Sequence, residues 1–166
     1  MNAQRGRGRQ DWATPPDLVA LVEATFGYQF ELDACANAVN AVAPKYYDLE
    51  TNGLEHPWRD ATWCNPPFEN IEPWVEKAVG EATRGVHSCM LVPFAAQGWK
   101  YRWHGNFESV VLVGRVTFVG ATTCINRDIA LLRFGPEAEL GCAGPGIRPA
   151  TEWYWRWRTN PAFSDC

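Results

Sequence analysis

One short segment combines residue types that could hold a planar amino group. Asn65, Pro66, Pro67 and Phe68 directly follow an apolar run, residues 61–64, that we predict to be a strand. Each proline fixes its own φ, lacks a backbone N–H and holds the preceding residue in extended geometry. The segment therefore keeps its carbonyl acceptors and loses two donors. The Asn65 side chain adds another acceptor, and Phe68 adds a flat apolar face.

A planar ligand with an exocyclic NH₂ group would suit this segment. Its two N–H donors would reach the Asn65 side chain and the Pro66 carbonyl, and its ring would stack on Phe68. A nucleobase fits this description, and a base within a duplex would have to be flipped out of the stack. The alternative is that the two prolines simply end the strand and that Phe68 belongs to the core.

The hydrophobic pattern around this segment predicts alternating helices and strands. Thr14 is expected to cap a helix that starts at Pro15 and ends at Gly27, and Gly85 is expected to close a second helix, residues 71–84. A basic, aromatic stretch, residues 97–106, is a loop or a helix. Residues 30–36 are expected to form a short buried strand that ends in a loop, and further strands are expected at residues 61–64, 86–94, 110–119, 129–134 and 151–158.

Helices that alternate with short apolar strands are typical of an α/β domain with a mostly parallel sheet. Such sheets bind ligands beyond the carboxyl ends of their strands, where Asn65 would lie. We expect residues 1–10 to form a flexible basic arm and residues 11–134 to form the catalytic domain. A Gly/Pro-rich loop and a C-terminal Trp/Arg strand, residues 135–166, are expected to pack on the same domain, with an antiparallel strand pair near its end.

The composition limits the class of protein. The chain has 166 residues, 46% hydrophobic and 20% charged, enough for a folded core without disulfides. No apolar run approaches the roughly 18 residues of a membrane span, and the polar start is not a secretory signal, so we expect a cytoplasmic protein. The six cysteines and three histidines lack metal-ligand spacing, so no metal site is expected. The net charge of −4 means that a nucleic acid would need a local basic patch.

The segment Asn65–Phe68 resembles the catalytic NPPY/NPPF tetrapeptide of S-adenosylmethionine-dependent amino-methyltransferases. More of the chain, about residues 11–134, is similar to one branch, the small phage-type DNA N6-adenine methyltransferases of the Dam-like family. The similar segments are, in order, DWATPPDLVALVEATFG, FELDACANAVNAVAPKYYD, NGLEHPW, WCNPPF, IEPWVEKA, CMLVPF, QGWKYRWHGN and VLVGRVTFVG.

The resemblance implies a Rossmann-like fold that binds S-adenosylmethionine and methylates the N6 amino group of a flipped-out adenine in double-stranded DNA. It also implies a phage protein that acts in the host cytoplasm, and we expect a monomer. By position, Asn65–Phe68 would form the catalytic loop, and Trp12, Thr14, Asp33 and Asp48 would contact the donor. The Asp33 carboxylate would pair with the donor's amino group and Asp48 with its ribose.

One departure from other methyltransferases concerns the donor loop. Many of them carry a glycine-rich turn after the first strand, whereas Asp33 is followed by ACANAVN, which contains no glycine.

Three basic residues are candidates for DNA contact. Lys100 and Arg102 alternate with aromatic residues, a mixture that can meet phosphates and wedge beside a flipped base. Arg115 lies in GRVTF, a stretch similar to the family. The alternatives are an amphipathic helix with core tryptophans for the first two and an ordinary surface charge for Arg115.

The sequence does not exclude three other functions. The same acceptor groups would serve the N4 amino group of cytosine or the side-chain amide of a protein glutamine. A non-catalytic module that binds DNA or donor with the same fold is an alternative of a different class.

Overall fold

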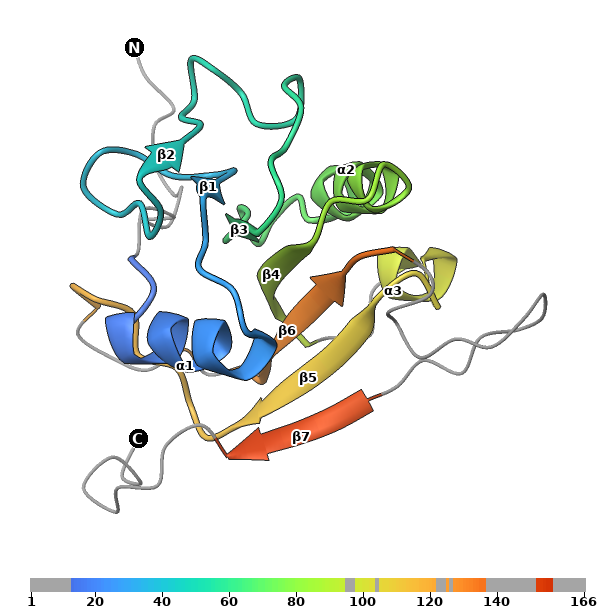
Figure 1. Ribbon diagram of the computed structural model, residues 1–166. Coiled ribbons are helices and arrows are strands. Elements are labelled where there is room, and N and C mark those ends of the chain that lie inside the picture. Colours follow the sequence, from blue (N-terminus) through green and yellow to red (C-terminus); the bar gives the residue numbers. More distant parts are fainter. Residues whose placement is uncertain are drawn as a thin grey trace, which may run out of the picture.

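The structure is a computed structural model that describes residues 13–94, 98–103, 105–121, 125, 127–136 and 152–156, without the side chains of Lys100, Tyr101 and residues 152–156. Within these ranges a seven-stranded sheet has the order β2-β1-β3-β4-β6-β5-β7 (Figure 1). The strands are β1 (Leu32–Asp33), β2 (Lys45–Tyr46), β3 (Thr62–Cys64), β4 (Ser88–Pro93), β5 (Glu108–Val113), β6 (Ile129–Phe134) and β7 (Glu152–Arg156). The helices are α1 (Pro16–Phe26), α2 (Glu72–Ala82) and α3 (Gly98–Arg102).

Strand direction gives the sheet two clearly different edges. β2, β1, β3 and β4 pair in parallel, and β7 pairs in parallel with β5. β6 lies between β4 and β5 and pairs antiparallel with both. All described strands except β6 therefore end at one edge of the sheet. This arrangement confirms the predicted Rossmann-like α/β fold with its mostly parallel sheet and antiparallel pair.

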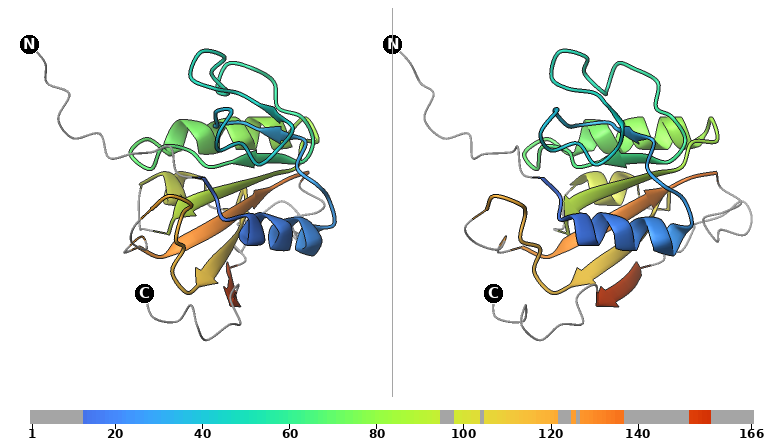
Figure 2. Two further views of the ribbon diagram at one scale, coloured as in Figure 1. Left: turned by 90° about the vertical axis from the view of Figure 1, so that its left-hand side faces the viewer. Right: turned by 60° about the vertical axis from the view of Figure 1, so that its left-hand side comes forward.

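Helices cover the two faces of the sheet, and the core is correspondingly divided (Figure 2). On β4, Met90 and Val92 belong to the same buried cluster as α2. Cys89 and Leu91, which alternate with them, belong to the cluster on the α1 side. A central strand covered on both faces must be apolar throughout, which explains why every residue of β4 is buried. None of the helices that the structure describes is long and apolar enough to cross a membrane.

The start of α1 differs from its sequence-based prediction by one residue. Pro15, not Thr14, is the N-cap, Pro16 is the first helical residue, and no side chain caps the helix. Pro15 has ψ 128°, the extended geometry that a following proline favours, so the Pro15-Pro16 pair delays the helix by one position. The predicted end is confirmed, because Gly27 adopts the left-handed conformation at φ 76° and its N–H donates to Glu23 O.

Two strands are much shorter than predicted. The run 30–36 contains only the two-residue β1, and the run 110–119 contains only β5, which begins at Glu108 and ends at Val113. Gly114 follows with φ 105°, a left-handed conformation that interrupts the regular strand. The apolar residues beyond it, Val116 and Phe118, are still buried. Their hydrophobicity therefore reflects core packing by an irregular segment rather than a longer strand.

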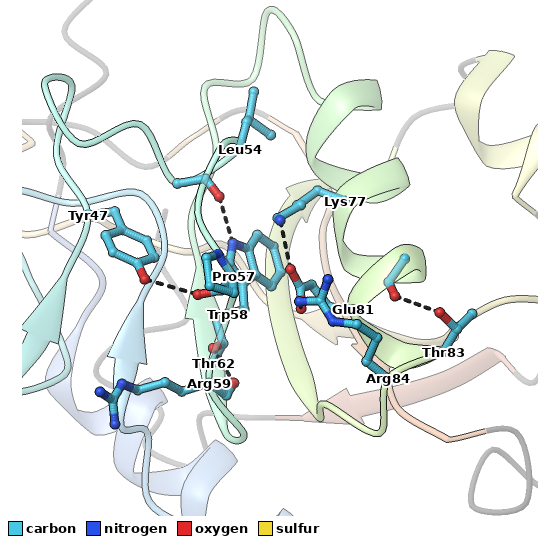
Figure 3. Close-up of polar contacts among 12 residues, drawn as sticks. Tyr47, Leu54, Pro57, Trp58, Arg59, Thr62, Lys77, Glu81, Thr83 and Arg84 are labelled. Carbon is cyan, nitrogen blue, oxygen red and sulfur yellow. Dashed lines mark hydrogen bonds and ion pairs between the residues drawn. The ribbon is translucent and has the colours of Figure 1, made fainter.

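The long connection between β2 and β3 is held against the core by hydrogen bonds from aromatic side chains (Figure 3). Tyr47 Oη donates to the Pro57 carbonyl at 2.9 Å, and Trp58 Nε1 donates to the Gly53 carbonyl at 2.8 Å. Trp58 is buried in the same cluster as α2. Gly53 itself lies so close to β1 that an added Cβ would stand 2.0 Å from the Ala34 carbonyl oxygen.

This contact predicts that Gly53→Ala destabilises the fold by about 3 kcal/mol or more, because backbone atoms on both sides must move. Gly80→Ala is the matched control, since Gly80 lies in α2 with open space around its Cα. Alanine there should raise stability by about 0.5–1 kcal/mol. Urea unfolding of both variants measures the difference. Equal stabilities for the two variants would contradict the close approach of Gly53 to Ala34.

Candidate functional site

The carboxyl edge of the parallel strands brings together most of the residues predicted to do chemistry. Asp33 is the last residue of β1, Asp48 lies two residues beyond β2, and Asn65 follows the last residue of β3. The strands are direct neighbours, because Asp33 is in register with both Tyr46 and Trp63. Residues that are far apart in the chain therefore meet at one place.

The tetrapeptide Asn65–Phe68 leaves β3 partly exposed. Pro66 is buried, whereas Asn65, Pro67 and Phe68 are half-buried. The buried Pro66 anchors the segment, and the turn closes where Asn70 N donates to Pro67 O at 3.1 Å. α2 begins two residues later with a proline in its first turn. The segment is thus held between a central strand and a helix.

The Phe68 ring packs against the core on one side and stays partly accessible to solvent. It packs edge-on against Phe118, with ring centroids 6.3 Å apart and an interplanar angle of 70°. Phe118 is 2% exposed and belongs to the α1-side cluster. The two alternatives for Phe68 in the sequence, core residue and stacking face, are therefore compatible: one edge of the ring is fixed while part of it stays accessible.

Asp33 is buried, and its carboxylate is directed at backbone amides. It is 2% exposed, Oδ1 accepts from Cys35 N at 3.2 Å, and Oδ2 accepts from Val42 N at 3.1 Å. The two bonds tie together the start and the end of the loop 34–42. Burial raises the pKa of Asp33 to about 6, although both backbone hydrogen bonds oppose the rise.

Two asparagines, which the sequence-based prediction missed, shape the same loop. Asn37 Oδ1 accepts from the backbone N–H groups of Val39 and Asn40, while Asn40 Oδ1 accepts from Asn37 N at 2.7 Å. Side-chain oxygens of this kind cap backbone turns without positive φ. They explain how ACANAVN turns tightly without a glycine. The Asn-x-x-Asn spacing was the signal that could have revealed this loop.

Asp48 forms a second polar turn beyond β2. Its Oδ1 accepts from Glu50 N at 3.0 Å and from Thr51 N and Thr51 Oγ1, both at 2.9 Å. The hydrogen bonds from Thr51, and then from Glu50, lower the pKa of Asp48, so it is ionised at neutral pH. Next to it, the Leu49 side chain is almost fully exposed. An anionic group and an apolar side chain thus lie side by side at the rim.

The segment before α1 reaches the same region. Val119 N donates to Ala13 O at 2.9 Å, an isolated bridge that joins this segment to the chain beyond β5. Thr14 is 4% exposed next to that bridge. Trp12, the other residue predicted here for donor contact, is outside the described residues.

The predicted DNA-contacting residues have different surroundings. Arg115 follows β5 at the carboxyl edge and is exposed. Arg102, on α3, pairs with Glu72 Oε1 at 2.5 Å, which neutralises part of its charge. The backbone of Lys100 is in α3, but its side chain is outside the described atoms. In the part of the chain that the structure covers, no three His, Cys, Asp or Glu side chains gather as metal ligands do.

The fold and this edge define a Rossmann-like α/β protein whose polar loops surround a proline-stiffened tetrapeptide. A family model described as DNA N-6-adenine-methyltransferase (Dam) matches residues 3–130. The chain belongs to this family, as its sequence segments predicted.

Two curated phage relatives carry the same name, DNA N-6-adenine-methyltransferase. The protein of Escherichia phage T1 is 34% identical over 87 residues, which are 51% of this chain and 36% of that protein. The protein of Haemophilus phage HP1 is 27% identical over 142 residues, which are 78% of this chain and 81% of that protein. The chain thus matches about a third of one relative and most of the other.

A solved structure, a putative RNA methyltransferase from Pyrococcus horikoshii, is similar at a TM-score of 0.42 and 14% identity. The similarity covers 68% of this chain and 66% of that one.

The environment of Asp33 predicts a titration inside the loop 34–42. The backbone amide signals of Cys35 and Val42 should shift together with a midpoint near pH 6 in an NMR titration. Because the pKa in the folded state lies above the ordinary value of 3.8, ionisation opposes folding. The contribution of Asp33 to stability is therefore present below about pH 4 and is lost as the pH rises through about 6.

The amide of Glu50 is the internal control for this titration. It donates to Asp48, whose pKa is lowered, so its signal should stay constant between pH 5 and 7. A midpoint near pH 4 at Cys35 and Val42 would show that the Asp33 carboxylate is hydrated rather than buried.

Proposed function

We propose that this chain transfers a methyl group from S-adenosylmethionine to the N6 amino group of an adenine flipped out of double-stranded DNA. The observation that carries the proposal is the position of Asn65–Phe68 at the carboxyl end of β3, beside the polar loops that follow β1 and β2. Membership of the DNA N-6-adenine-methyltransferase family supports both the reaction and the substrate.

The residues that follow β1 and β2 fit a donor with a charged amino acid end and a ribose. Asp48 offers a partly exposed, ionised carboxylate that can accept from ribose hydroxyls. The loop 34–42 offers backbone groups held in place by Asp33 and Asn37. In this proposal Asp33 acts through that loop, because both of its oxygens already accept backbone N–H groups. Thr14 and Trp12 would contact the donor from the segment before α1.

The tetrapeptide would hold the base. The Asn65 side-chain oxygen and the Pro66 carbonyl accept the two amino protons, and the accessible part of Phe68 contacts the ring. These contacts draw electron density toward the amino nitrogen and fix its direction of attack. When bound, S-adenosylmethionine would supply an electrophilic methyl carbon, and its sulfur would leave as the neutral thioether as the methyl group passes to the amino nitrogen. Asn65 and Pro66 would hold that nitrogen in place while its extra proton passes to water.

The reaction is tested by incubating the protein with unmethylated duplex DNA and labelled S-adenosylmethionine, followed by mass spectrometry of the nucleosides. N6-methyladenine is the expected product. N4-methylcytosine would overturn the assignment of the base. Label found in protein and absent from DNA would overturn the assignment of the substrate.

Asn65→Ala tests the role of the tetrapeptide. Methyl transfer should fall by at least about 100-fold, the scale seen when one preorganised hydrogen bond to a reacting group is removed. Donor binding measured by calorimetry should stay nearly unchanged, because Asn65 contacts the base in this mechanism. If donor affinity falls in parallel with activity, Asn65 belongs to the donor site instead. Circular dichroism shows that the variant is folded.

A further inference from the structure

The connection between β5 and β6 brings two arginines to the edge that carries the site. β5 and β6 pair antiparallel, with Leu112 in register with Ile129. Beyond the strands, the bond from Ile125 N to Val116 O keeps the same register. Arg115 precedes Val116 by one residue, and Arg127 follows Ile125 by two. This register places Arg127 opposite Gly114, the residue before Arg115, so the two arginines lie on neighbouring segments.

Both arginines carry a charge that no described residue of the protein neutralises. Arg115 and Arg127 are exposed, and among the described residues neither has an acidic partner. The neighbouring Asp128 is also exposed, but no ion pair links it to Arg127. Other arginines are paired, Arg84 with Glu81, Arg102 with Glu72 and Arg133 with Glu108. Two unpaired guanidinium groups on neighbouring segments can each bind an external anion.

The surroundings of Arg127 are open to a ligand and adjoin the proposed base site. Arg127 lines a pocket of about 280 Å³ with Pro93, Phe94 and Asp128. Pro93 ends β4, the strand next to β3, and Phe94 N donates to Asp128 O at 2.7 Å. The pocket therefore lies one strand away from the strand end that carries the tetrapeptide.

The same connection contacts the tetrapeptide directly. Phe118, three residues beyond Arg115, packs against Phe68. A ligand bound by the two arginines would therefore lie at a fixed position relative to Asn65. Arg59 offers a contrast, because it is exposed and has no ion-pair partner in the described ranges, but it precedes β3, at the opposite edge of the sheet.

We propose that Arg115 and Arg127 form a phosphate-binding pair that grips the DNA backbone beside the flipped base. The inference rests on the proposed function and extends it to Arg127, which is not among the three basic residues that the sequence singled out. Guanidinium groups neutralise phosphates regardless of base sequence, so the pair would set the register of the duplex on the protein. Recognition of particular bases would come from other groups.

The test is DNA binding by fluorescence anisotropy at several salt concentrations, with Arg115→Ala, Arg127→Ala and the double variant. Each lost phosphate contact should reduce the slope of log affinity against log salt by about 0.9, and the double variant by about twice that. At about 50 mM salt, affinity should fall roughly tenfold for each arginine. Arg59→Ala is the control, since it removes the same charge from the opposite edge and should leave the slope unchanged.

Two further measurements separate this inference from the proposed function. Arg127→Lys should restore most of the slope, because it keeps the charge, and donor binding should be unchanged in every variant. Suppose that the unaltered protein methylates DNA but that Arg115→Ala and Arg127→Ala show the same slope of log affinity against log salt. The proposal that these arginines bind phosphate is then wrong, and the proposed function stands. Equal losses in Arg59→Ala would mean a general charge effect and also overturn the pair. If the unaltered protein neither binds nor methylates DNA, both proposals fail.

Discussion

Parallel backbone pairing of β1 with β2 and β3 is the constraint on which the rest of the site depends. These strands have only two or three residues, yet their pairing extends beyond their ends. Ala34 N donates to Trp63 O at 2.8 Å, and Tyr47 N donates to Asp33 O at 2.9 Å. These bonds bring the loops after β1, β2 and β3 to one edge. Without this pairing, the tetrapeptide and the polar loops, which are far apart in the sequence, would also be far apart in space.

In the loop 34–42, side-chain oxygens stabilise the tight turn that glycines allow in many nucleotide-binding folds. Asp33, Asn37 and Asn40 each accept backbone N–H groups of residues 35–42 or of one another. A close backbone approach comes instead from outside the loop, at Gly53 against Ala34. Such a loop depends on buried hydrogen bonds for its shape, so its conformation is linked to the ionisation of Asp33. A glycine-rich turn would have no comparable dependence on pH.

Under the proposed function, an acidic protein binds a polyanion and must restrict its positive charge to particular places. The net charge is −4, and several arginines form ion pairs with glutamates. Glu81 is an extreme case, because it lies buried on α2 between Lys77, at 2.7 Å, and Arg84. These ion pairs neutralise arginines away from the proposed site and so weaken their attraction for phosphate. The unpaired guanidinium groups at the carboxyl edge then provide a local field without a basic surface overall.

Local rules made much of this protein predictable from its sequence. Apolar periodicity located α2 and β4, Gly27 marked the end of α1, and the two prolines after Cys64 marked the edge where the tetrapeptide lies. Hydrophobic period, glycine at positive φ and proline geometry act within a few residues, so a single chain displays them. The Dam family was equally recognisable, because its ordered segments lie along the chain.

Contacts between distant segments were decided only by the tertiary structure. No local pattern indicates that Phe118 packs against Phe68, that Asp33 turns toward Val42, or that β6 lies between β4 and β5. The apolar stretch beyond Val113 predicted a longer strand, and packing turned it into an irregular core segment instead. The physical reason is that register and side-chain packing depend on which surfaces meet, and hydrophobicity along one segment does not specify its partner.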